Sequence, residues 1–184
     1  MKKNDVVTVE VTDIGIGGEG IGKVDGYTLF IKDAIIGDVV EAKIMKAKKN
    51  YGYARLMNIL TPSEYRVGNP VCQVARKCGG CQIQGLSYER QLLYKEEKVR
   101  EDLKRLGGFA EPPVNPVLGM DEPYRYRNKA QFPFGKDKEG RIVTGFYAGR
   151  THSIVPETDC ALGIKENQTI LNLLLNFMNE NHIE

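Results

Sequence analysis

The stretch Val6-Val7-Thr8-Val9-Glu10-Val11 is rich in β-branched residues, and from Val7 onward apolar and polar side chains alternate. This pattern predicts a β-strand with one buried face. Moving outward along the chain, Asp25-Gly26 is a strong hairpin signal, and turn residues at 36–38 and 48–50 separate three further apolar runs. About five short strands in so short a segment predict a small closed barrel of the OB type. The expected strands after the hairpin are residues 28–31, 39–46 and 51–60.

The segment Gly15-Ile16-Gly17-Gly18-Glu19-Gly20 matches the G-x-G-x-x-G pattern of dinucleotide-binding loops. In that motif the glycines open a helix, whereas residues 21–26 contain two more glycines and end in the hairpin signal. We therefore expect a tight loop or a bulge at the barrel rim and no nucleotide site.

The four cysteines of the chain form a three-plus-one pattern. Cys72, Cys78 and Cys81 make a C-x5-C-G-G-C run, and Cys160 stands alone much later. Four thiolates suit a structural zinc ion or an iron–sulfur cluster. Zinc ribbons usually pair two C-x2-C knuckles, so the asymmetric spacing favours a cubane cluster and leaves zinc as the alternative.

The redox setting of these cysteines follows from the rest of the chain. Residues 1–5 open no signal peptide, and no apolar run is long enough to span a membrane. We therefore expect a cytoplasmic protein that keeps its thiols reduced, which makes two disulfides less favoured than a metal site.

Composition is ordinary for a globular protein, with 41% hydrophobic and 27% charged residues and a net charge of +2. The basic residues are clustered, however, and tyrosines lie among them, as expected of a surface that binds a nucleic-acid backbone. One cluster precedes Tyr51 and Tyr53, and the other surrounds Tyr126. The candidate RNA-binding residues are Lys46, Lys48, Lys49, Arg125, Arg127 and Lys129.

The second cluster has two interpretations. In a strand, Arg125, Arg127 and Lys129 would share one face and repel one another unless an anion such as phosphate lay there. Alternatively, these cations pair with acids elsewhere, for example Asp121, Glu122 or Glu139.

The chain after the barrel predicts helices and an antiparallel sheet. Ser87 is an expected N-cap and Gly107-Gly108 an expected stop for a helix with an apolar stripe, which we interpret as core. Residues 126–134 and 142–147 predict a hairpin, residues 152–155 a further extended segment, and residues 168–178 a strongly apolar helix. The stripe of the first helix contains Tyr88, Leu92, Val99, Leu103 and Leu106.

The order of these features resembles one family. The barrel, the C-x5-C-G-G-C run, the helix beginning Tyr88-Glu89-Arg90-Gln91, the segment Tyr126-Arg127-Asn128-Lys129 and the late Cys160 are together similar to the N-terminal portion of the RNA uracil-5-methyltransferases, in the iron–sulfur branch that modifies ribosomal RNA. The resemblance implies an α+β chain with a five-stranded OB-like TRAM barrel at residues 1–62. It implies an antiparallel-sheet-plus-helix domain at residues 70–184 that carries a four-cysteine site.

The resemblance also implies roles. Cys72, Cys78, Cys81 and Cys160 would hold a [4Fe-4S] cluster. The partner would be RNA, with 23S rRNA as the implied target and transfer RNA as the alternative that the sequence leaves open. In the family a thiolate attacks C6 of a flipped uracil, the methyl group is added at C5, and a base completes the elimination. Those groups and the S-adenosylmethionine site belong to a C-terminal Rossmann-like domain that this chain lacks. No catalytic or cofactor-binding residue is therefore assigned, and the 184-residue chain is expected to be inactive alone.

Two other functions remain open from the residues. The chain could be a stand-alone RNA-binding adaptor with a zinc site or a cluster and no catalytic activity. An electron-transfer role for the cluster is the weakest interpretation, because simple ferredoxins pack their ligands closely. No membrane association and no obligate protein partner are expected.

Overall fold

The computed structural model describes residues 1–149 and 151–183 and divides into two compact units. The first unit contains Met1–Asn69 and Gln82–Leu118. The second contains Pro70–Cys81 and the described residues of Gly119–Glu184. Among the described residues, no helix is long and apolar enough to cross a membrane.

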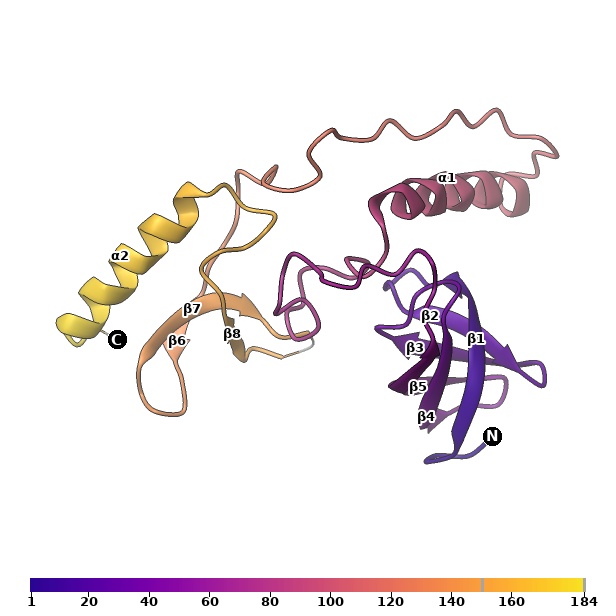
Figure 1. Cartoon of the computed structure of the whole chain (residues 1–184), viewed down its shortest axis with the longest axis horizontal. Helices are drawn as coiled ribbons and strands as arrows, with labels where there is room; N and C mark the ends of the chain where they lie inside the picture. The colour runs from indigo at the N-terminus through magenta and orange to yellow at the C-terminus, as the bar shows by residue number, and fades with distance from the viewer. Residues whose placement is uncertain (150, 184) are drawn as a thin grey trace. The chain divides into compact units, whose positions relative to one another are not determined.

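A closed five-stranded barrel forms the N-terminal part of the first unit, as the sequence predicted (Figure 1). The strand order is β1-β2-β3-β5-β4, and pairing of β1 with β4 closes the barrel. All pairs are antiparallel except β3 with β5, which run parallel. The strands are β1 Val6–Ile14, β2 Gly20–Val24, β3 Tyr27–Lys32, β4 Val39–Ala47 and β5 Tyr51–Thr61.

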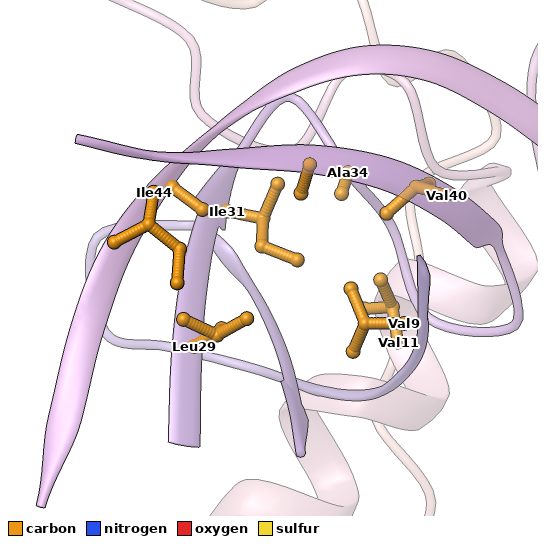
Figure 2. Packing of buried hydrophobic residues seen from close by; sticks show 9 residues of the cluster. Val9, Val11, Leu29, Ile31, Ala34, Val40 and Ile44 are labelled. Carbon is orange, nitrogen blue, oxygen red and sulfur yellow. The ribbon is translucent and has the colours of Figure 1, made fainter. Parts of the chain in front are cut away.

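The barrel interior is filled by aliphatic side chains from alternate positions of the strands. Leu29 and Ile31 from β3 and Val40 and Ile44 from β4 are completely buried, and Figure 2 shows them converging between the strands. Alternation puts every second residue inside, which explains why the β-branched runs of the sequence predicted these strands so well. The remaining buried members of this cluster are Val9, Val11, Ala34, Ala42 and Ala54.

The glycine-rich segment is a loop between β1 and β2, as expected. Gly15 and Glu19 are joined by a backbone hydrogen bond, and β1 is bulged between Val11 and Asp13. Gly22 on β2 lies so close to β1 that an added Cβ would be 2.4 Å from the Glu10 carbonyl oxygen. The close approach of two strands explains this glycine without any nucleotide.

A largely buried ion pair joins the loop before β4 to the segment after β5. Asp38 is fully buried and accepts hydrogen bonds from the backbone N–H groups of Ile35 and Ser63, at 2.9 and 3.0 Å. Its two carboxylate oxygens also accept hydrogen bonds from Arg66. Burial by itself would raise the pKa of Asp38, but these hydrogen bonds and the Arg66 charge lower it overall. This clasp of Asp38 and Arg66 holds the segment after β5 against the barrel.

Helix α1, Tyr88–Arg105, contacts the end of β1 through Tyr94, whose hydroxyl donates to the Ile14 carbonyl at 3.4 Å. Ser87 caps it, as predicted, by accepting a hydrogen bond from the Arg90 N–H. Leu86 is buried with Ile14 and Ile35, and Tyr94 packs against this group. The prediction that the whole apolar stripe is core was wrong, because Val99 and Leu106 are 50% and 86% exposed.

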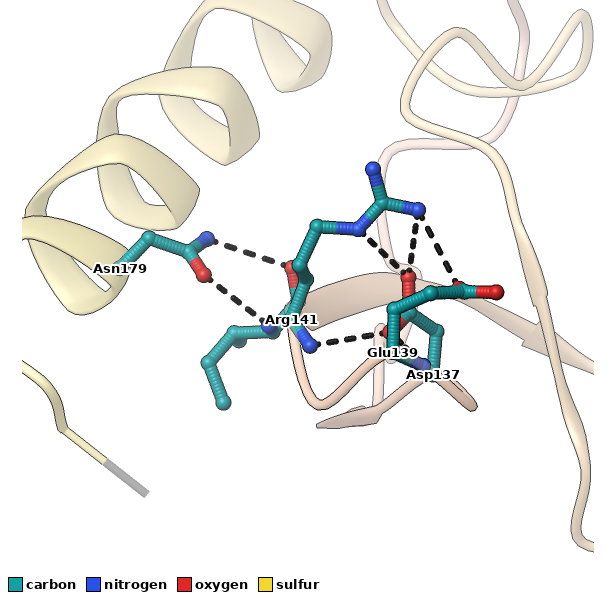
Figure 3. Close-up of polar contacts among 5 residues, drawn as sticks. Asp137, Glu139, Arg141 and Asn179 are labelled. Carbon is teal, nitrogen blue, oxygen red and sulfur yellow. Dashed lines mark hydrogen bonds and ion pairs between the residues drawn. The ribbon is translucent and has the colours of Figure 1, made fainter.

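Within its described residues, the second unit contains a three-stranded antiparallel sheet and one helix. The elements are β6 Phe134–Lys136, β7 Ile142–Tyr147, β8 Ile154–Pro156 and α2 Glu166–Glu180. The amide of Asn179 on α2 both accepts from the Ile142 N–H, at 3.0 Å, and donates to the Ile142 carbonyl, at 3.3 Å (Figure 3). Arg141 pairs with Asp137 and Glu139 in the β6–β7 turn.

The strand predicted at residues 126–134 is mostly absent. Only Phe134 belongs to β6, and Arg125, immediately before the predicted strand, has a φ of 57°, which is incompatible with the extended face inferred for Arg125, Arg127 and Lys129. The N–H groups of Arg125 and Arg127 instead donate to the carbonyls of Ala161 and Leu162, at 3.0 and 2.8 Å. Alternation of side chains could not reveal this pairing, because it depends on a segment 35 residues later.

Candidate functional site

The four cysteines all lie in the second unit, as free, partly exposed thiols. Local backbone geometry explains the Cys-Gly-Gly-Cys run. Cys78 forms an isolated antiparallel bridge with Ala148, and the Gly79 N–H donates to the Tyr147 carbonyl at 3.0 Å. An added Cβ on Gly79 would be 3.1 Å from that same oxygen, so a larger residue would crowd the bridge. One residue further along the chain, the Gly80 N–H donates to the Cys78 sulfur at 3.3 Å.

The pKa values of two cysteines show that the distant Cys160 influences the C-x5-C-G-G-C run. Burial raises the pKa of Cys81, negative charge on Cys160, Cys78 or Cys72 raises it further, and Arg127 opposes the rise. Burial also raises the pKa of Cys72, which Cys160 and Cys78 influence in the same direction. The sulfurs of Cys72, Cys78 and Cys160 thus lie close enough to Cys81 to influence the pKa of its thiol.

The ligand assignment nevertheless stays a prediction. Within residues 1–149 and 151–183, no group of three or more His, Cys, Asp or Glu side chains has the arrangement that would hold a metal ion. The donor chemistry of four thiols in one unit suits the predicted metal, but their positions do not form a finished ligand sphere.

Arg125, a predicted RNA contact, forms hydrogen bonds with other residues of the chain. Its Nη1 donates to Asp159 Oδ1 at 2.6 Å and to the carbonyl of Cys160 at 3.0 Å. The hydrogen bond from Arg125 is the main reason that the pKa of Asp159 is lowered. The proposed face of three cations is therefore wrong in its geometry, and the acid that pairs with Arg125 is not one of those considered from sequence. Arg125 anchors the segment that carries Cys160.

The other two cations of that group have different surroundings. Arg127 is half-buried and lies close enough to Cys81 for its positive charge to oppose the rise that burial causes in the pKa of that thiol. Lys129 is exposed. The structure therefore does not gather Arg125, Arg127 and Lys129 on one strand face.

Exposed lysines surround the β4–β5 turn of the barrel. Lys46, Lys48 and Lys49 are all exposed. The backbone of this turn is fixed by Tyr27, whose hydroxyl donates to the Lys48 carbonyl at 2.8 Å and accepts from the Lys48 N–H at 3.1 Å. These candidate contacts therefore project from a rigid turn.

An aromatic group on the barrel adds a residue that sequence reasoning missed. The rings of Phe30, Tyr51 and Tyr53 lie with centroids 5.6 to 5.9 Å apart. Phe30 joins the two tyrosines because β3 runs parallel to β5 with Phe30 opposite Tyr53. Alternation within β5 indicates that Tyr51 and Tyr53 share a face, but no local pattern indicates the partner strand.

Comparison with known proteins supports the resemblance drawn from the sequence. Residues 2–57 match the TRAM domain. The chain is 46% identical over 174 residues to a protein of Clostridium tetani named as an RNA methyltransferase, covering 95% of this chain and 37% of that protein. A protein of Halalkalibacterium halodurans with the same kind of name is 44% identical over 171 residues, with 93% of this chain and again 37% of that protein covered.

One solved structure matches nearly the whole chain. The tRNA (uracil-54, C5)-methyltransferase of Pyrococcus abyssi, in complex with S-adenosyl-L-homocysteine, has a TM-score of 0.60 and 25% identity. The match covers 95% of this chain and 37% of that enzyme. The chain therefore spans little more than a third of the length of the proteins it matches. The predicted resemblance to RNA methyltransferases with a TRAM domain is confirmed.

Proposed function

We propose that this chain is the RNA-holding part of an S-adenosylmethionine-dependent RNA (uracil-C5)-methyltransferase, with 23S rRNA as the target. The observation that carries the proposal is a closed TRAM-type barrel with a rigid, exposed cationic turn at Lys46, Lys48 and Lys49. Barrels of this kind accept splayed bases of looped RNA, and lysines bind the phosphates between those bases.

The methylation chemistry rests on the relatives. The Pyrococcus abyssi enzyme acts on a uracil of tRNA and binds the product form of the methyl donor, which supports uracil C5 and S-adenosylmethionine for the whole protein. In our proposal the residues described here bind and orient RNA and supply no nucleophile. The four thiols are all assigned to a metal.

The metal part of the proposal is a [4Fe-4S] cluster held by Cys72, Cys78, Cys81 and Cys160. The support is the location of all four cysteines in one unit and the influence of the other three sulfurs on the pKa of the Cys81 thiol. Such a cluster would link the loop at residues 70–81 to the segment after β8. Its contribution would be structural, since metal binding and folding are coupled where ligands come from distant segments. Zinc on the same thiols is the alternative.

Binding to RNA can be measured directly by fluorescence anisotropy. A labelled hairpin with a single-stranded loop should bind more tightly than a DNA duplex of equal length, and the affinity should fall linearly on a logarithmic salt scale. Equal affinity for the two, or no binding at low salt, would contradict the proposal.

The metal is tested separately. Protein purified without oxygen should be brown and contain about four irons per chain. Stoichiometric zinc without visible absorption would replace the cluster by the alternative and would leave the RNA proposal standing.

A further inference from the structure

The outer face of the barrel carries an ordered pattern of side chains on β3, β5 and β4. Along β5, Tyr51, Tyr53 and Arg55 point outward, with the buried Gly52 and Ala54 between them. Parallel pairing places Phe30 opposite Tyr53 and Lys32 opposite Arg55. Across the other edge of β5, Arg55 lies opposite Lys43 of β4. A row of cations thus runs beside a row of aromatic rings.

The aromatic row is accessible although it lies on a folded barrel. Tyr51 and Tyr53 are 39% and 40% exposed, and Phe30 beside them on β3 is half-buried. Phe30 and Tyr53 are tilted by 32° at 5.6 Å, while Tyr51 meets both rings edge-on. The barrel interior is already filled by aliphatic residues, so the three aromatic rings are not part of its buried core. An exposed aromatic group of this kind is unusual on a surface that binds nothing. Their position therefore points to a ligand with flat apolar faces.

The cationic row points to the same ligand. Arg55 and Lys43 are cross-strand partners, and like charges in this arrangement are destabilising. In the described parts of the chain neither forms an ion pair. The nearest acid on this face of β4 is Glu41, which accepts a hydrogen bond from Asn58 at 2.8 Å. A phosphate between Arg55 and Lys43 would relieve the repulsion.

We propose that Phe30, Tyr51 and Tyr53 form a platform on which bases of single-stranded RNA stack, while Arg55 and Lys43 hold the adjoining phosphates. This inference rests on the proposed function, because it names the part of the barrel that receives RNA. Bases stack on aromatic rings with little dependence on sequence, whereas the charges bind any polyanion. The platform therefore selects unpaired nucleic acid over duplex, whose bases are already stacked.

The platform is tested with a labelled oligouridylate of about 12 nucleotides, within the usual range for one barrel of this type. An abasic oligonucleotide of the same length and charge serves as the second probe. Tyr53→Ala should weaken oligouridylate binding about tenfold, and Tyr53→Phe by no more than about twofold, because the ring is kept. Binding of the abasic probe should be unchanged in both. Met57→Ala, another exposed position of β5, is the matched control and should bind oligouridylate normally.

A spectroscopic readout avoids dependence on affinity alone. The chain contains no tryptophan, so Tyr53→Trp introduces a single reporter at the platform. Its emission should be quenched by oligouridylate and not by the abasic probe. Circular dichroism establishes folding of every variant before binding is measured.

The outcomes separate the two proposals. If the wild-type chain binds oligouridylate and Tyr53→Ala binds it equally well, the platform is wrong and the RNA-binding function stands. If the two probes bind the wild-type chain with the same affinity, stacking makes no contribution and the platform is also wrong. If the wild-type chain binds neither probe nor structured RNA, both proposals fail.

Discussion

The barrel and the second unit are stabilised in different ways. The barrel buries a cluster of nine aliphatic residues and closes its sheet, so every strand has two neighbours. The second unit has a sheet with two strands of three residues each, and its buried apolar residues are few and scattered: Ile142, Val155, Ala161 and Leu171. It also contains all four cysteines. We infer from this difference that the barrel folds on its own core, whereas the second unit depends on the metal that we propose.

The largest effect that would sharpen this comparison is expected for Cys160→Ser. Loss of one ligand should remove most of the metal and, with it, the folding free energy that metal binding supplies, which is on the order of 10 kcal/mol for a structural zinc ion. Hydrogen exchange should then show loss of protection in β7 and α2 and unchanged protection in β1 to β5. Thr158→Ser, in the same segment, is the control. Unaltered protection of the second unit in Cys160→Ser would show that it does not depend on this thiol.

Leu29→Ala should destabilise the barrel and leave the second unit unaffected, the reverse of what is expected for Cys160→Ser. Leu29 is fully buried in the barrel, so truncation should lower the free energy of unfolding of the barrel by about 2 to 5 kcal/mol. Amide hydrogen exchange of the barrel, measured across a urea series, reports this effect. The amides of the second unit should keep their protection from exchange. Equal destabilisation of both units would mean that they fold as one cooperative body and would break the comparison.

Asp38→Asn should destabilise the barrel by about 2 to 3 kcal/mol, because Arg66 would lose its buried charged partner. The effect depends on pH. The pKa of Asp38 is lowered in the folded state, so its contribution is complete above the ordinary value of 3.8 and is lost as pH falls through the folded pKa.

Urea unfolding of wild type and Asp38→Asn at a series of pH values measures this dependence. Their difference in unfolding free energy should be constant near neutral pH and shrink below about pH 4. A difference that does not vary with pH would show that the Asp38 charge is not what stabilises the clasp.

The smallest stability effect is expected for Asp159→Asn in the second unit. The side chains of Arg125 and Asp159 are 28% and 41% exposed, so solvent screens the pair and its removal should cost about 1 kcal/mol or less. Thermal unfolding at low and high salt should show that this small destabilisation disappears as the salt concentration rises. A destabilisation as large as that of Asp38→Asn would mean that this exposed pair is as important as the buried one.

Sequence patterns predicted the barrel, its Asp25-Gly26 turn, the Ser87 cap and both helices because each depends on neighbouring residues. They failed where the structure depends on contacts between distant segments. The parallel pairing of β3 with β5, which brings Phe30 to Tyr53, leaves no local signal. The same is true of Arg125, whose left-handed backbone and bond to Asp159 depend on a segment that follows β8.

The candidate site residues also fall into those that local sequence patterns predicted and those that depend on distant segments. The three lysines at 46, 48 and 49 were predicted from a local run of charge, and they are exposed at a turn. The four cysteines were predicted from their spacing, and the fold places them in one unit, but their role as ligands stays a prediction. The strand face at 125–129 was inferred from alternation alone and is wrong, because alternation assumes a strand.

RNA binding across a salt series tests the central claim most directly. In wild type, the logarithm of the affinity for a looped RNA hairpin should fall linearly with the logarithm of salt concentration. Replacing Lys46, Lys48 and Lys49 together with alanine should reduce that slope by about 2, because each lysine–phosphate interaction with a single strand contributes about 0.7. Lys136→Ala at the end of β6 and Lys138→Ala in the β6–β7 turn provide a control for the removal of positive charge. If the triple variant stays folded and keeps the slope and affinity of wild type, this turn of the barrel does not hold RNA.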